Sequence, residues 1–455
     1  MAERAAVVVL GAGLAGLAAA GVLGDRAVVL EREPRPGGLV RTEEWGGYWF
    51  DHVLHLLYFG ADRTTENRIL DLVGRDVMRA MRPDAWVETV HGTVRYPFQM
   101  HLGGLPTEIV VSCLRDLAQV TFGPHTEAPA DFTSMLEQTF GRAMCEAFLF
   151  PYNRKMWRRP LESLAPSGFQ WTITHPDFDG VVRGALEKDQ DFATYNAQSW
   201  YPVPPGGAPV RGMEVLAVAL AGQVRDLRLH HEILEIDLDR RVVTARHAGN
   251  ELEFAYGEGL CSTLPLPQTV ALCKQAPAEL REACRTLVRN RVYSASFSIR
   301  GPRPENRGLW RYYSDETLIF TRLIYPHHFD EFSAPPDGWG LLAEITEPAE
   351  QPRQADAAVL DRCQEDIALA GALPQGCEVI DRHLIVADPA YVVFTVENQP
   401  VMEAARTFLR SHGIEPLGRY GRWEYSSMAQ VMRDGLAWGE ALLAGQAQAA
   451  GVVAP

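Results

Sequence analysis

Three glycines and one acid have the types and spacing of a phosphate-binding turn. Gly11, Gly13 and Gly16 form a G-x-G-x-x-G pattern, and Glu31 lies twenty residues after Gly11. In such a pattern the first glycine makes a tight turn, the second lets the backbone approach a pyrophosphate, and the third lets a helix meet a strand. The carboxylate accepts hydrogen bonds from a ribose. These residues predict a dinucleotide site.

The elements around these glycines are those that the site needs. Residues 7–10 are a β-branched run, which indicates a buried parallel strand, and an alanine-rich helical pattern follows to about Leu23. A second strand, Ala27 to Leu30, leads directly into Glu31. The amino terminus of the helix would present amides and a partial positive charge to phosphate groups. The complete unit favours the dinucleotide interpretation over a glycine-rich turn in some other α/β fold.

Composition narrows the range of functions. An apolar content of 47% and a charged content of 22% are those of an ordinary globular protein, and 455 residues correspond to about two or three structural units. A net charge of −15 disfavours nucleic acid as a partner. Seven scattered cysteines without a C-x-x-C pair fit a reducing, cytoplasmic compartment and predict no metal site. The uncharged run Ala5–Gly24 contains five glycines, so we expect no membrane span there and a soluble chain.

A second glycine turn follows Glu31. Residues 35–42 have the sequence R-P-G-G-L-V-R-T, with Arg32 just before them. They resemble the R-x-G-G-x-x-x-T signature of the large FAD-dependent family that contains amine oxidases, protoporphyrinogen oxidase, phytoene desaturase and UDP-galactopyranose mutase. The resemblance implies FAD as the cofactor, with Gly37 and Gly38 near the flavin end and an arginine, which we assign as Arg32, at the phosphates. A surface loop rich in proline and glycine is the alternative interpretation.

Four segments farther along resemble UDP-galactopyranose mutase in particular, and they occur in that family's order. The first, F-D-H-V-L-H at 50–55, is similar to the histidine-containing loop beside the flavin. The second, Y-N-R-K-M-W at 152–157, is similar to Y-x-x-K-x-W. The third, at 320–329, resembles Y-T-R-I-I-E-x-K-H-F, and the fourth, at 418–431, resembles G-R-x-G-x-Y-x-Y-x-D-M-x-Q-V. Residues 390–393 are more weakly similar to A-Y-P-V of the same family. Together these segments extend the resemblance over nearly the whole chain.

The resemblance to the mutases implies roles for individual residues. The reacting centre would contain His55, less directly His52, and Arg322. Substrate contacts would come from Tyr152 and Trp157 at the nucleoside and from Arg322, Tyr391 and Tyr425 at the diphosphate. Besides the two glycine turns, flavin contacts would come from Arg419, Met428 and Gln430.

Three departures from the mutase pattern bear on the substrate. The glycine pair before the mutase histidine is Val53–Leu54 here, Tyr325 stands in place of a glutamate, and Ser426–Ser427 replace a pair that ends in aspartate. A relative that acts on a different sugar nucleotide therefore remains open.

The expected fold class is α/β, with a Rossmann-like FAD-binding domain of the GR2 type and an inserted α+β substrate domain made of a helical segment and an antiparallel sheet. Helical periodicity over about 64–82 and 428–443 predicts two helices, with a frayed tail from Ala444 to Pro455. The expected boundaries are 1–85, 205–275 and 396–455 for three FAD-domain parts, 86–204 for the helical insertion and 276–395 for the substrate-domain sheet.

The resemblance implies a redox-neutral reaction, the interconversion of pyranose and furanose forms of a nucleotide sugar such as UDP-galactose. In that chemistry N5 of reduced FAD attacks the anomeric carbon, and NADPH is the expected reductant. The implied partner is a small-molecule nucleotide sugar, and a homo-oligomer remains open.

Two other classes of function stay in view. An FAD oxidase or desaturase of the amine-oxidase type commonly holds a lysine near the flavin. The chain has only Lys155, Lys188 and Lys274, and none follows a substrate-domain strand, which counts against that chemistry. The third class is a flavin- or nucleotide-binding protein without catalytic activity.

Overall fold

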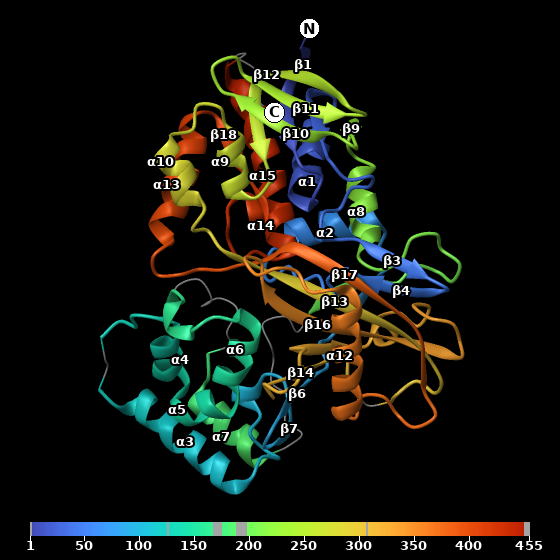
Figure 1. The fold of residues 1–455 in the computed structure, drawn as a ribbon, viewed down its shortest axis with the longest axis vertical. Coiled ribbons are helices and arrows are strands. Elements are labelled where there is room, and N and C mark those ends of the chain that lie inside the picture. The colour runs from blue at the N-terminus through green and yellow to red at the C-terminus, as the bar shows by residue number, and fades with distance from the viewer. Residues whose placement is uncertain (1, 125–126, 167–174, 188–197, 306–307, 450–455) are drawn as a thin grey trace.

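The structure is a computed structural model that describes residues 2–124, 127–166, 175–187, 198–305 and 308–449. Two large sheets and a group of helices make up the fold, and Figure 1 shows the first sheet at one end of the molecule and the helical group at the other. Segments distant in sequence meet in both sheets.

The first sheet has seven strands in the order β10-β11-β12-β1-β2-β9, with β18 also paired to β12. The central strands β12, β1, β2 and β9 run parallel, whereas β10 and β11 add an antiparallel edge. The strands are β1 (Glu3–Leu10), β2 (Ala27–Leu30), β9 (Asp226–Arg228), β10 (Glu232–Asp237), β11 (Val242–His247), β12 (Asn250–Ser262) and β18 (Ile414–Pro416).

Helices cover this sheet because its central strands are apolar on both faces. Residues 7–10 and 27–30 are all buried, as expected for strands inside a parallel sheet. The helix α1 packs against both α15 and α8, and Figure 1 shows it between them. The helices of this part are α1 (Leu14–Leu23), α2 (Arg63–Val73), α8 (Glu214–Ala221), α9 (Leu266–Leu272), α10 (Ala278–Cys284), α13 (Gln399–Ser411), α14 (Gly418–Gly421) and α15 (Met428–Ala449).

The second sheet also has seven strands, in the order β17-β13-β16-β15-β14-β6-β7. Every residue of β16 is buried, because α12 (Asp356–Leu369) lies on one side of this sheet and the rest of the protein on the other. The strands are β6 (Ala85–Thr89), β7 (Gly92–Arg95), β13 (Arg289–Arg300), β14 (Trp310–Tyr313), β15 (Arg322–Ile324), β16 (Gly338–Pro348) and β17 (Glu378–Val392).

A helical group lies between β7 and β8 in the chain. Its core joins aromatic and aliphatic side chains such as Phe98, Phe132 and Leu136, all fully or almost fully buried. The helices of this group are α3 (Thr107–Phe122), α4 (Phe132–Phe140), α5 (Arg142–Met144), α6 (Phe150–Trp157) and α7 (Phe178–Leu186). The short α11 (Pro326–Phe329) follows β15 and packs on β16. Two small hairpin sheets pair β3 (Thr42–Trp45) with β4 (Tyr48–Asp51) and β5 (Met78–Met81) with β8 (Ser199–Pro202).

The expected fold class is confirmed, and three details differ from the sequence predictions. The helix predicted over 64–82 ends at Val73, because Gly74 leaves it at a φ of 105°, and Met78–Met81 instead pairs with β8. The helix α15 continues to Ala449 rather than fraying from Ala444, while 450–455 lie outside the described residues. The second sheet is antiparallel except where β14 pairs in parallel with β6.

The run Ala5–Gly24 is shared between a strand and a short helix. Among the described residues, no helix combines the length and apolarity that crossing a bilayer requires.

Candidate functional site

The first glycine turn leaves open space at the amino terminus of α1. Gly11 follows β1 with a φ of 95°, a conformation that favours glycine. A Cβ on Gly16 would lie 2.1 Å from the carbonyl oxygen of Gly11, so the helix can approach the turn only without a side chain there. A Cβ on Gly13, by contrast, would meet nothing within 4 Å. Since no side chain caps α1, its first amides are available to an anion.

Glu31 lies against this turn. It is buried, and its two carboxylate oxygens accept hydrogen bonds from the amides of Ala12, at 2.7 Å, and Glu33, at 3.0 Å. Each oxygen keeps further lone pairs that could accept from a ribose hydroxyl. Arg32 points elsewhere: its side chain is 62% exposed and pairs with Glu33 at the surface.

The second glycine turn is held against the first. The amide of Gly37 donates to the carbonyl of Ala12 at 2.8 Å, and Gly37 and Gly13 form a bridge. A Cβ on Gly38 would lie 3.4 Å from the Cα of Gly13. The two turns thus form one continuous backbone surface beside the start of α1, which is the arrangement that a dinucleotide phosphate requires.

A cavity of about 660 Å³ lies between the two sheets and the helical group. It contains most of the residues that the sequence singled out for the substrate and the reacting centre. Its walls include His55, Tyr152, Trp157, Arg322, Tyr391, Arg419, Tyr425, Met428 and Gln430. They also include aromatic and polar groups that the sequence did not single out, among them Phe148, Tyr312 and Glu344.

The hydrogen-bond centre of the cavity is Glu344. Arg322 on β15 and Glu344 on β16 are direct cross-strand partners, so their side chains emerge side by side on the same face. Arg322 donates to Glu344 Oε2 through Nε at 2.8 Å and also through Nη2. Tyr391 on β17 donates its hydroxyl proton to Oε1 at 2.8 Å. Burial would raise the pKa of Glu344, but Arg322 and the Tyr391 hydrogen bond together hold it below its usual value.

His55 lies next to this pair in the loop after β4. Burial, reinforced by the charge of Arg322, lowers the pKa of His55 to about 4, so the imidazole is neutral at pH 7. Arg322 Nη2 lies 3.3 Å from His55 Nε2, and only an unprotonated Nε2 can accept from it. The ring proton is therefore on Nδ1, which faces the carbonyl of Val53 at 3.5 Å.

An aromatic wall closes another side of the cavity. The rings of Tyr391 and Tyr425 stack with centroids 6.1 Å apart, and the Arg419 guanidinium lies 5.5 Å and 4.2 Å from their centroids. Within the described residues Arg419 makes a side-chain hydrogen bond with Tyr425, and its buried Nε has no hydrogen-bond partner. Trp157 meets Tyr391 edge-on at 6.1 Å. A desolvated cation beside polar rings suits an anionic ligand.

Tyr152 lies in a second aromatic group on the helical side. It stacks on Phe148 at 5.2 Å and meets Tyr312 edge-on at 5.5 Å. The guanidinium of Arg322 lies 5.9 Å from the Tyr312 ring. The cavity therefore offers flat apolar surfaces at one end and cations in the middle.

The structure does not bring His52 to this cavity. Its Nε2 lies 2.7 Å from Glu43, and burial lowers its pKa. At the other end of the cavity, Ser427 and Gln430 cap α15: Gln430 Oε1 accepts from the Ser427 amide at 2.8 Å, and Ser427 Oγ accepts from the Gln430 amide at 3.2 Å. The first turn of α15, with Met428, thus forms a fixed boundary of the cavity.

Glu344 is the main residue that sequence analysis missed. It stands within Leu341–Ile345, an otherwise apolar strand segment, and a carboxylate in such a run needs a buried partner. That isolated acid was the available signal.

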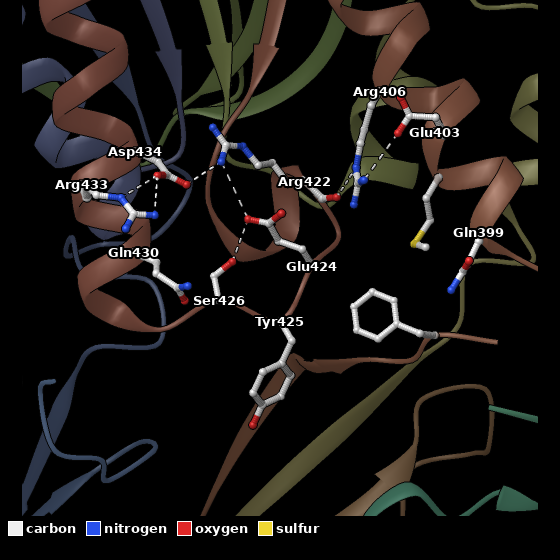
Figure 2. A pocket seen from close by; sticks show the side chains of 12 residues that line it. Gln399, Glu403, Arg406, Arg422, Glu424, Tyr425, Ser426, Gln430, Arg433 and Asp434 are labelled. Atoms are coloured by element: carbon white, nitrogen blue, oxygen red, sulfur yellow. Dashed lines mark hydrogen bonds and ion pairs between the residues drawn. The ribbon is translucent and has the colours of Figure 1, made fainter. Parts of the chain in front are cut away.

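A second cavity, of about 700 Å³, adjoins the first along Tyr425, Ser426, Gln430 and Arg433. Figure 2 shows that its charged groups pair with one another. Asp434 receives both Arg422 and Arg433, and Arg406 lies 3.7 Å from Glu403. Because each of these cations has a carboxylate partner, this cavity lacks the uncompensated charge of the first. In the part of the chain that the structure describes, no group of acidic, histidine or cysteine side chains could hold a metal ion.

The fold and the glycine turns define the class first. Residues 9–72 match the family of NAD(P)-binding Rossmann-like domains, and the match covers the end of β1, α1, β2 and both glycine turns. The chain thus contains a Rossmann-like dinucleotide-binding unit.

Solved structures extend the likeness to the whole chain. A reduced UDP-galactopyranose mutase is 21% identical, with a TM-score of 0.86 over 96% of this chain and 95% of that one. A protein from Exiguobacterium sp. 255-15, provisionally assigned as a protoporphyrinogen oxidase, is 15% identical, with a TM-score of 0.69 over 98% and 99%. A putrescine oxidase is 14% identical, with a TM-score of 0.60 over 98% and 100%. The expected resemblance to the mutase is confirmed for the fold.

Proposed function

We propose that the protein is an FAD-dependent mutase that interconverts pyranose and furanose forms of a nucleotide sugar, UDP-galactose or a related one. The observation that carries this proposal is the single cavity in which Arg322, Arg419, His55 and stacked aromatic rings converge. Two cations between aromatic walls, the buried Arg322 and the partly buried Arg419, suit a nucleoside diphosphate. The similarity of the fold to UDP-galactopyranose mutase supports the same reading.

The residues present fit FAD. The open space over Gly13, the uncapped start of α1 and the acceptor atoms of Glu31 suit the pyrophosphate and a ribose. Further contacts would come from Gly11, Gly16, Gly37, Gly38, Arg419, Met428 and Gln430. FAD, when bound and reduced, supplies a nucleophilic N5 for covalent catalysis at the anomeric carbon. NADPH is the reductant that we expect to prime it.

The protein's own groups would hold the leaving diphosphate while the sugar ring opens and closes. Arg322 and Arg419 can donate charge-assisted hydrogen bonds to it, and Tyr425 lies beside them. Tyr152 and Trp157 offer flat faces for the nucleoside. His55 is neutral, so it can orient groups at the reacting centre without adding charge.

An oxidase of the amine-oxidase type would need a lysine near the flavin, and the positions of the described lysines do not support that alternative. Lys155 is buried but donates to the carbonyls of Tyr313 and Asp315, at 2.9 Å and 2.7 Å, and Lys274 lies 3.4 Å from Asp237. Neither lines the cavity. Lys188 lies outside the described residues.

The test is anaerobic incubation of FAD-loaded protein with UDP-galactopyranose, before and after chemical reduction, with chromatographic separation of the products. We expect a new isomeric peak with the reduced protein and none with the oxidised protein. If neither redox state gives an isomer of any nucleotide sugar offered, the proposal is wrong. Heat-denatured, reduced protein is the control for uncatalysed rearrangement.

A further inference from the structure

Glu344 takes up donors that would otherwise face a ligand. Its side chain is 4% exposed, and its carboxylate accepts from Arg322 Nε, Arg322 Nη2 and the Tyr391 hydroxyl. An ionised carboxylate has no proton to give, so each of these hydrogen bonds must be donated to it. The phenol proton of Tyr391 therefore points to Glu344.

Counting donors shows what remains for a ligand. A guanidinium carries five N–H groups in a planar fork. Glu344 and His55 occupy the Nε and Nη2 edge of Arg322. Nη1 makes no hydrogen bond to the described residues and is accessible from the cavity. Tyr391 has a single proton and gives it to Glu344, so its oxygen presents only lone pairs.

We propose that Glu344 is a positioning residue that decides which donors a diphosphate meets. It turns Arg322 so that Nη1 alone faces the ligand, and it removes Tyr391 from the set of phosphate donors. The diphosphate is then held by Arg322 Nη1 and by Arg419, while Tyr391 serves as a ring wall. This inference rests on the proposed function for its ligand class, and it revises the role that sequence resemblance gave to Tyr391.

The position of Glu344 has a cost for binding. A carboxylate in direct contact with Arg322 offsets the charge that attracts an anion, so it weakens affinity for any diphosphate. The same contact fixes the guanidinium in a single orientation, which matters for the rate of a reaction that depends on geometry. Removal of the charge should therefore strengthen binding and slow turnover, a split that general structural damage would not produce.

The strand provides a matched control. Glu347 is also buried on β16, accepts from Tyr293 at 2.6 Å and lies 3.6 Å from Arg291, but it does not line the cavity. Glu347→Gln and Glu344→Gln thus remove the same charge from similar surroundings on the same strand. A difference in pyrophosphate affinity or turnover between the two variants therefore comes from the position of Glu344 in the cavity and not from the loss of a buried ion pair.

The experiment is calorimetric titration of FAD-loaded protein with inorganic pyrophosphate, which tests the donors without requiring a nucleoside or a sugar. We expect Glu344→Gln to bind pyrophosphate about three- to tenfold more tightly than wild type, and Glu347→Gln to bind it unchanged. Tyr391→Phe should stay within about twofold, whereas loss of a true phosphate donor would cost about tenfold or more. Turnover by Glu344→Gln should fall about 10- to 100-fold.

Several results would overturn the inference. They are unchanged or weaker pyrophosphate binding by Glu344→Gln, equal changes in both glutamine variants, a tenfold loss in Tyr391→Phe, or no pyrophosphate binding by the wild type. If Glu344→Gln does not fold, Tyr391→Phe decides alone. Failure of the wild type to isomerise a nucleotide sugar would remove the proposed function and leave the pyrophosphate comparison standing.

Discussion

Two buried arginine–carboxylate pairs occupy different parts of this molecule. Arg211 and Asp330 are each 2% exposed and are joined by Nε at 2.8 Å and Nη2 at 2.9 Å. Arg211 also donates to the carbonyls of Pro204 and Pro205, at 2.8 Å each. Arg322 and Glu344 are buried to a similar degree and hydrogen-bonded through the same two guanidinium atoms.

The two pairs differ in the number of guanidinium nitrogens that have no hydrogen bond to the protein. All three nitrogens of Arg211 donate within the protein, through four of its five N–H groups, and these hydrogen bonds fix the 204–205 turn against Asp330. Arg322 keeps Nη1 for the cavity. Burial and ion pairing therefore do not separate a structural arginine from a functional one, whereas the count of remaining donors does.

The largest effect should follow from removal of the arginine with the free donor. Arg322→Ala should lower the turnover of a nucleotide sugar by about 100- to 1,000-fold, because one preorganised donor to the developing negative charge is lost. The flavin content, measured by absorbance, should equal that of the wild type, since the glycine turns are untouched. Turnover within a fewfold of wild type would remove Arg322 from the mechanism and with it the functional half of the comparison.

Disruption of the Arg211–Asp330 pair should instead lower the stability of the protein. Asp330→Asn leaves the Arg211 charge buried without its partner, and we expect the free energy of unfolding to fall by about 3 kcal/mol in urea titrations. Pyrophosphate affinity should be unchanged. Glu331→Gln is the control: this neighbour pairs with Arg79 at 2.8 Å but is about half exposed, so the loss should stay below about 1 kcal/mol. Equal losses in the two variants would contradict a special role for the buried pair.

The sequence was most informative where structure is local. The strand Ala27–Leu30 and the start of α1 at Leu14 follow from short patterns in which neighbouring residues determine one another. The helix predicted beyond Val73 failed for the opposite reason: Met78–Met81 is a strand only because β8, more than a hundred residues later, pairs with it. Pairing partners at that separation leave no periodic trace in the sequence.

In the candidate site, too, contacts between residues distant in sequence could not be predicted. The segments that carry Arg322 and Tyr391 could be found from their resemblance to a family, but the central role of Glu344 depends on the register that sets it opposite Arg322. Resemblance alone assigns Tyr391 to the diphosphate, whereas the position of its proton follows from the contact with Glu344, which only the folded structure shows. Arg32 and His52 are residues of a type that could serve the site. Arg32 instead pairs with Glu33 at the surface and His52 contacts Glu43, and neither contact can be read from the motifs.

The smallest expected effect is a pH dependence of the free energy of unfolding that comes from His55 in the cavity. The pKa of His55 is lowered from 6.5 to about 4 by burial first and then by Arg322, so the unfolded chain binds a proton there that the folded protein does not. Stability from this group is complete above about pH 6.5 and is lost as the pH falls toward 4. His55→Gln should therefore flatten the fall in unfolding free energy between these limits by about 1–3 kcal/mol. If His55→Gln keeps the wild-type slope, burial and Arg322 do not hold the imidazole neutral, and Nε2 is not the acceptor that the donor count requires.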